Sequence, residues 1–228
     1  MKKLLLLSLL GLWLGSSFAN GQTVLAFWDF NGESPTSAVL GDGLEYDASQ
    51  GSGLLETFSS ATTGTNFRID SDGTSLNSLD GVGSDDAMRF QRGPRWNNGG
   101  FEISVDMTNF NSAELSYATY NTGNTTGDYQ FSYRVGTEGS FTNIGSPTTI
   151  PLSNYALVST SIPSAVDNQE DVFFRVTFSN LDGSSGNAGH RVMVDNVQVT
   201  AIPEPSTYAA IFGLFALGMI VWHRRKRS

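Results

Sequence analysis

The chain has 228 residues, no cysteine, two histidines and a formal net charge of −9. The lack of cysteine excludes thiol catalysis and cysteine-ligated metal sites, and it fits an exported domain large enough to fold without disulfides. Residues 22–202 carry 21 acidic residues against seven arginines and no lysine, a net charge of −14. Such a surface repels nucleic acid and anionic membranes, so nucleic-acid binding is not expected.

The first 21 residues have the three parts of a secretory signal peptide. Two lysines follow Met1, an apolar run covers residues 4–14, and small residues lead to Ala19. Cleavage after residue 19 or after residue 21 suits this pattern. One domain is therefore predicted over residues 22–202, which is long enough to bury a substantial core.

The domain is predicted to be all-β, a two-sheet antiparallel β-sandwich, because its apolar residues alternate with polar ones along most segments. Glycine, asparagine, serine, threonine and aspartate separate these segments, as in turns. No stretch of residues 22–202 shows a helical period, and no repeat suggests a propeller or a solenoid. The expected strands include residues 24–30, 101–107, 113–120, 129–135, 155–162, 172–178 and 191–199.

An acidic, glycine-rich stretch from Asp70 to Asp86 separates two of the early segments. Carboxylate oxygens at short spacing suit calcium, but the sequence Asp70-Ser71-Asp72-Gly73 departs from the EF-hand spacing. A solvated loop is the favoured interpretation of this stretch.

The loop over residues 91–100 is the predicted recognition element. Its glycines, proline and asparagines favour a turn, and turns tend to push large side chains outward. An exposed indole can stack on a sugar ring while arginine and asparagine bond the hydroxyl groups. A hairpin whose tryptophan folds back onto the edge of the sandwich is the alternative, and it is slightly favoured for the tryptophan itself. The candidate ligand-binding residues are Trp96, Arg92, Arg95, Asn97 and Asn98.

Catalytic patterns are nearly absent from the sequence. His190 is the one histidine before the C-terminal tail, so neither a serine-type triad nor a three-histidine zinc site is expected. A glycoside hydrolase needs only two carboxylates at a suitable separation, which keeps it as an alternative. A non-catalytic protein is predicted, with no catalytic residues, and His190 is expected to form hydrogen bonds at the edge of a loop.

The last predicted strand changes parity in its middle. Val192 and Val194 face one way, while Val197 and Val199 face the other, with Asp195-Asn196 between them. A β-bulge or a switch between sheets produces such a change.

The opening segment Ala26-Phe27-Trp28-Asp29-Phe30-Asn31-Gly32 and the closing segment at 191–199 resemble the first and last strands of bacterial jelly-roll, carbohydrate-binding-like domains. The resemblance covers most of residues 23–200 by strand pattern. It implies a structural calcium shared by an acid near the first strand and an acid in the last strand, for which Asp29 and Asp195 are the nearest matches.

The C-terminal segment, residues 203–228, combines three parts in a fixed order. Pro203-Glu204-Pro205 comes first, an apolar stretch at 208–222 follows, and the basic tail closes the chain with Arg224, Arg225, Lys226 and Arg227. Fifteen helical residues rise only about 22 Å against about 30 Å of bilayer core, so a short transmembrane helix is predicted with help from snorkelling side chains. The basic tail is expected on the cytoplasmic side.

This order of parts resembles the PEP-CTERM sorting signal of exopolysaccharide-producing Gram-negative bacteria. The resemblance implies a membrane-embedded exosortase as partner, which cuts near Pro203-Glu204-Pro205 and passes the protein to the cell surface or the extracellular matrix. A plain C-terminal membrane anchor is the alternative.

The favoured function is a non-catalytic surface or matrix protein that binds polysaccharide. A purely structural matrix component is the second class. Ice binding or another surface-adhesion role is the third, since some proteins with similar C-terminal segments have it, although no Thr-x-Thr array repeats here. A glycoside hydrolase is the fourth.

Overall fold

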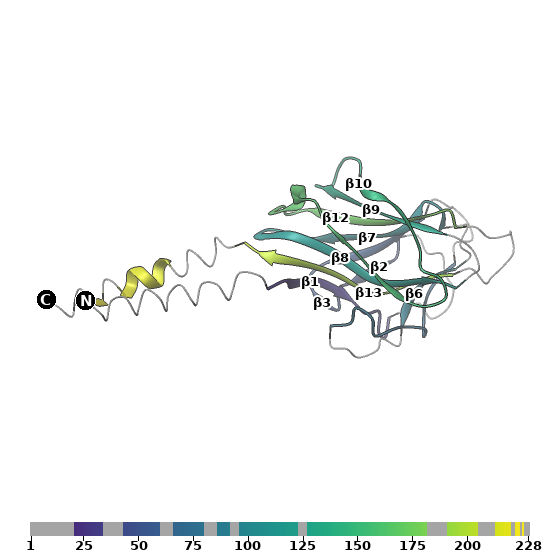
Figure 1. The fold of residues 1–228 in the computed structure, drawn as a ribbon, viewed down its shortest axis with the longest axis horizontal. Helices are drawn as coiled ribbons and strands as arrows, with labels where there is room; N and C mark the ends of the chain where they lie inside the picture. Colours follow the sequence, from purple (N-terminus) through teal and green to yellow (C-terminus); the bar gives the residue numbers. More distant parts are fainter. Residues whose placement is uncertain are drawn as a thin grey trace.

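The computed structural model describes residues 21–33, 43–59, 66–79, 86–91, 96–122, 127–181, 191–204, 213–219, 222–223 and 225. Residues 1–20 of the predicted signal peptide, Arg92, Arg95, His190, Pro205, Arg224, Lys226 and Arg227 lie outside these residues. The described part of residues 21–204 forms thirteen strands in two layers (Figure 1), which confirms the predicted antiparallel β-sandwich.

The first sheet has seven strands in the order β11-β8-β13-β1-β3, with β6 paired to β13 and β5 paired to β6. The strand pairings within it are antiparallel. Its strands are β1 (Thr23–Trp28), β3 (Gln50–Gly51), β5 (Asn66–Asp70), β6 (Ala87–Gln91), β8 (Phe110–Asn121), β11 (Ala156–Ser161) and β13 (Arg191–Pro203).

The second sheet has six strands in the order β10-β9-β12-β7-β4-β2. A short 3-10 helix, Ser164–Val166, joins β11 to β12. The strands are β2 (Glu45–Asp47), β4 (Leu54–Phe58), β7 (Gly99–Val105), β9 (Asp128–Val135), β10 (Thr142–Thr149) and β12 (Val172–Ser179).

The core lies between the sheets and consists of one face of each alternating strand. In β12 the residues Val172, Phe174, Val176 and Phe178 are fully buried, whereas the side chains between them are only partly covered. Tyr117 of β8 packs edge-on against Phe101 and Phe131 of the other sheet. Period-two alternation therefore gives each strand one core face, as half-buried sheets require.

The change of parity in β13 is confirmed as a bulge. Its pairing with β8 shifts register between Asp195 and Gln198, and Asn196 has a left-handed φ of 49°. Residues before the bulge pair with β6 on one side, and residues after it pair with β1 on that same side. One long strand thus joins two shorter ones placed end to end.

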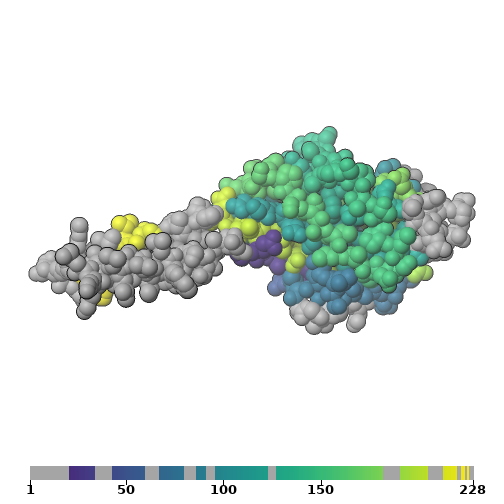
Figure 2. All heavy atoms as spheres, in the orientation of Figure 1, coloured from purple at the N-terminus to yellow at the C-terminus, as the bar shows by residue number. Residues whose placement is uncertain are grey.

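The two ends of the sandwich domain leave from neighbouring strands. Thr23 of β1 is the antiparallel partner of Ala201 in β13. Figure 2 shows the purple start of β1 beside the yellow end of β13 at the left of the domain. The segments that precede and follow the domain therefore attach at the same place.

Candidate functional site

The connection over residues 71–79 lies against the outer face of the first sheet, and the bulge in β13 holds it there. Because the bulge turns two successive side chains outward, Asp195 and Asn196 both face this connection and both are completely buried. The backbone N–H of Thr74 donates to Asp195 Oδ2 at 2.7 Å, and Asn196 Nδ2 donates to the carbonyl oxygens of Thr74 and Leu76 at 2.6 and 2.9 Å. We call residues 71–79 the strap.

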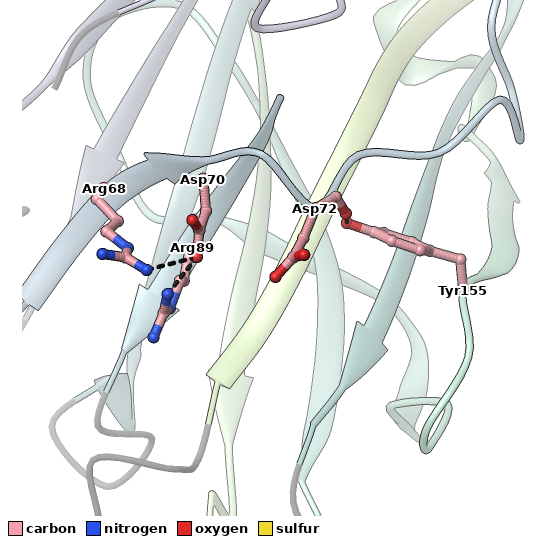
Figure 3. A network of polar contacts seen from close by, with 5 residues as sticks. All are labelled: Arg68, Asp70, Asp72, Arg89 and Tyr155. Carbon is pink, nitrogen blue, oxygen red and sulfur yellow. Dashed lines mark hydrogen bonds and ion pairs between the residues drawn. The ribbon is translucent and has the colours of Figure 1, made fainter. Parts of the chain in front are cut away.

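Further polar contacts fix both ends of the strap. Asn77 Nδ2 donates to the carbonyl of Asn196 at 2.7 Å and to Ser116 Oγ of β8 at 3.1 Å. Tyr155 Oη donates to the carbonyl of Asp72 at 2.7 Å, as Figure 3 shows. Burial, and secondarily the charge of Asp195, raises the pKa of the Tyr155 phenol well above its usual range, so it stays a donor.

An ion-pair cluster anchors the strand that leads into the strap. Asp70 accepts from Arg68 at 2.7 Å and from Arg89, whose side chain is 2% exposed (Figure 3). A buried guanidinium needs such a partner, because leaving it unpaired would be strongly destabilising. This cluster has a structural explanation, and it fixes where the strap starts.

A pocket of about 820 Å³ opens beside the strap, at the junction of β1, β3 and β13. Phe27 and Val24 contribute apolar surface, whereas most of the other side chains are polar. Pockets of 300–1,000 Å³ with a few converging polar groups are typical of small-ligand sites. The lining residues are Thr23, Val24, Phe27, Asp29, Asn31, Ser49, Gln50, Gly51, Ser78, Leu79 and Asn196.

Two buried oxygens belong to residues in the wall of this pocket. Ser78 Oγ and Asn196 Oδ1 have no hydrogen-bond partner within the described ranges. A buried polar atom without a partner costs about 1–3 kcal/mol. These two oxygens are acceptors buried behind the surface of the pocket.

The predicted calcium pair fits this region only in part. Asp195 accepts backbone N–H groups of Thr74 and Asn196, each at 2.7 Å, so its carboxylate already holds the strap. Asp29 accepts from Ser49 Oγ at 2.6 Å and lines the pocket. Within the described residues, no group of three or more His, Cys, Asp or Glu side chains could hold a metal ion. The oxygens nearest in kind to calcium ligands are those of Asp29, Ser78 and Asn196.

Trp96 is not the exposed platform that the sequence suggested. Its side chain has no exposed surface, and its ring lies 4.7 Å from that of Phe90 and 6.3 Å from that of Phe67. The prediction of an exposed indole in the loop at 91–100 is wrong, because the aromatic core beneath the loop takes the ring inward. The folded-back alternative describes it correctly.

The asparagines beside Trp96 have structural contacts. Asn97 Oδ1 accepts the backbone N–H of Leu181 at 2.8 Å. Asn98 is exposed, adopts a left-handed φ of 62° and donates its backbone N–H to the carbonyl of Phe178 at 2.8 Å. Both residues thus tie the turn to the end of β12. Arg92 and Arg95 lie outside the described residues.

The outer face of the second sheet carries a cluster that sequence reasoning missed. Arg175 lies over the rings of Phe58 and Phe141, 4.6 and 3.7 Å from their centroids, and Arg134 lies over Phe141 at 4.7 Å. Glu102 pairs with Arg175 at 2.5 Å. Alternation placed these residues on one outward face, but only the strand order brings them together. Since guanidinium groups cover the rings, these contacts stabilise the sheet and leave the ring faces unavailable for stacking on a ligand.

The sorting segment begins inside the folded domain. Pro203 is the last residue of β13, and the backbone N–H of Glu204 donates to the carbonyl of Asn109 at 2.8 Å. Residues 213–219 are helical, and Arg225, in the tail, is exposed. The predicted transmembrane helix at 208–222 is not confirmed, since within the described ranges no helix has the length and apolarity needed to cross a bilayer.

Comparison with solved structures finds β-sandwich domains at very low identity. The CBM22-1 xylan-binding domain of Xyn10C from Paenibacillus barcinonensis matches with a TM-score of 0.45 and 11% identity, over 81% of this chain and 98% of that domain. The K1 cleaved adhesin domain of Lys-gingipain from Porphyromonas gingivalis W83 matches with a TM-score of 0.45 and 12% identity, over 79% of this chain and 98% of that domain. The C-terminal family 22 carbohydrate-binding module of Clostridium thermocellum Xyn10B matches with a TM-score of 0.41 and 9% identity, over 78% and 93%.

Comparison with protein families concerns the C-terminal end. No curated protein matches the chain. A family model described as the PEP-CTERM protein-sorting motif matches residues 201–227, which include Pro203, Glu204, Pro205 and the basic tail. The chain is therefore a β-sandwich protein that carries a PEP-CTERM sorting motif.

Proposed function

We propose that this protein is a non-catalytic component of the cell surface or extracellular matrix that an exosortase releases from the membrane and that binds polysaccharide in the pocket beside the strap. The sorting motif implies export and exosortase processing, and it is the observation that carries the sorting part of the proposal. The signal peptide at residues 1–21 and a transient membrane anchor at 208–222 belong to the same proposal.

Support for a sugar ligand comes from the pocket. A pyranose unit has hydroxyl groups that donate and accept hydrogen bonds and a face of C–H groups that packs on apolar surface. The pocket offers both kinds of partner, with the amides of Asn31 and Gln50, the carboxylate of Asp29 and the ring of Phe27 around one cavity. Its volume of about 820 Å³ suits one or two sugar units.

Calcium is the proposed ion of this region. Asp29, Ser78 and Asn196 would supply oxygen ligands, and the ion would hold the strap against β1 and β13. Calcium takes six to eight oxygen ligands, of which these side chains would supply a part.

Sorting is tested by the mass of the protein recovered from the cell surface. We expect a chain cut close to Pro203-Glu204-Pro205 that lacks Trp222, and we expect Glu204→Ala to stay in the inner membrane with its tail intact. Glu170→Ala, at an exposed acid of the same domain, is the matched control and should be sorted normally. Surface protein that retains Trp222 would favour a plain anchor instead.

A further inference from the structure

The first residues of the sorting motif are part of the β-sheet, not of a free linker. Ile202 pairs with Asn111 and Pro203 with Phe110, and Glu204 bonds the carbonyl of Asn109. The half of the motif nearest to the domain is thus held along β8. Ile202, Pro203 and Glu204 are all half-buried.

The surface that holds this segment is itself cross-linked. The backbone N–H of Asn109 donates to Asn168 Oδ1 at 2.9 Å, and the backbone N–H of Asn168 donates to the carbonyl of Phe110 at 2.9 Å. Ser112 N–H donates to Asp167 Oδ1 at 3.0 Å. The turn before β8 and the turn after the 3-10 helix therefore hold each other in place. The start of β8 is thus expected to stay where it is when the motif separates from it.

The distance to the apolar stretch is short. Between Glu204 and Tyr208 the chain has three residues, which span at most about 14 Å when extended. A membrane-embedded enzyme that works on this motif therefore meets the end of the sandwich. Enzymes and receptors that take an extended segment bond its main-chain groups. Here β8 already pairs with Ile202 and Pro203, and the N–H of Glu204 already bonds Asn109.

We propose that the exosortase binds the motif only after Ile202–Glu204 separates from Asn109–Asn111, so that the end of β13 is the surface this partner must displace. The inference rests on the proposed exosortase processing. Separation of a strand end is inexpensive where side chains are half exposed, in contrast to the buried centre of the same strand. The domain itself stays folded, because the strap and the bulge at Asp195 lie farther up β13.

A cross-strand disulfide tests this directly, since the chain has no cysteine of its own. Asn111→Cys with Ile202→Cys joins antiparallel partners at the motif. Such partners lie about 4.5–5.5 Å apart between Cα atoms, within the range that a disulfide spans. The matched control is Glu114→Cys with Thr200→Cys, which joins the same two strands before the motif and leaves residues 202–204 free to separate.

The measurement is the rate at which the full-length, exported chain loses its C-terminal tail in pulse-chase labelling, with and without a membrane-permeable reductant. We expect the disulfide between residues 111 and 202, the motif lock, to block processing, and we expect reductant to restore it. The variant with the disulfide between residues 114 and 200 should be processed like the parent. Processing of the oxidised motif lock at the control rate would overturn the inference. A parent chain that is never processed would instead overturn the proposed function.

Discussion

Two connections of this domain differ in structure from what their sequences indicate. The loop ending at Trp96–Gly100 has a sequence typical of an exposed recognition turn, yet its tryptophan is fully buried. The stretch from Asp70 to Asp86 has a sequence typical of a solvated acidic loop, yet the backbone of the strap within it is hydrogen-bonded to two fully buried side chains of β13, and the strap borders the pocket. Turn composition thus indicates where the chain reverses direction. The side chains of the underlying sheets determine which groups of the turn are buried.

The largest expected loss of stability comes from removing the buried tryptophan of the first connection. Trp96→Ala removes a ring packed against Phe90 and Phe67, so we expect a loss of about 3–5 kcal/mol in the free energy of unfolding, measured by urea denaturation. Asn98→Gly, at an exposed position with left-handed φ in the same turn, is the control and should be nearly neutral. A stable Trp96→Ala protein would show that the indole does not belong to the core.

The next effect releases the strap. Asp195→Ala leaves the backbone N–H groups of Thr74 and Asn196 without their carboxylate partner, and we expect a loss of about 3 kcal/mol together with faster proteolysis within residues 71–79. Glu170→Ala, at an exposed acid, is the control and should change the free energy of unfolding by less than about 0.5 kcal/mol. Unchanged protease resistance in Asp195→Ala would mean that other contacts hold the strap.

A smaller effect concerns calcium. With calcium at 100 times its dissociation constant, binding contributes roughly 2.7 kcal/mol, so chelation should lower the melting temperature of the parent protein. The same chelator should leave Asp29→Asn unchanged, because that variant loses a charged ligand of the proposed site. If the parent melts at the same temperature with and without chelator, the calcium proposal fails.

The fold was predictable because its signal is local. Short stretches of sequence are enough to show the alternation in segments such as Val172–Phe178 and the parity change at Asp195-Asn196. The structure confirms both. The PEP-CTERM motif was likewise readable as a contiguous pattern.

The site was less predictable because it depends on distant pairs. Thr74 and Asp195 are 121 positions apart, and nothing in the sequence near either residue specifies the other. The burial of Trp96 depends partly on such a pair, since Phe67 reaches it only through the pairing of β5 with β6. A clue to the pocket was available at the bulge, where two successive polar residues interrupt an otherwise apolar strand.

Sugar binding in the pocket beside the strap is the central claim, and affinity electrophoresis of the processed protein in gels containing neutral or acidic polysaccharides tests it most directly. The account predicts retardation in at least one polymer, and a loss of about 30-fold in affinity for Asn31→Ala with Gln50→Ala, since two hydrogen bonds contribute about 1 kcal/mol each. Thr142→Ala with Asn143→Ala, on exposed positions of β10 in the other sheet, should bind like the parent. Equal retardation of the pocket variant and the parent, or no retardation of the parent in any polymer, would contradict the claim.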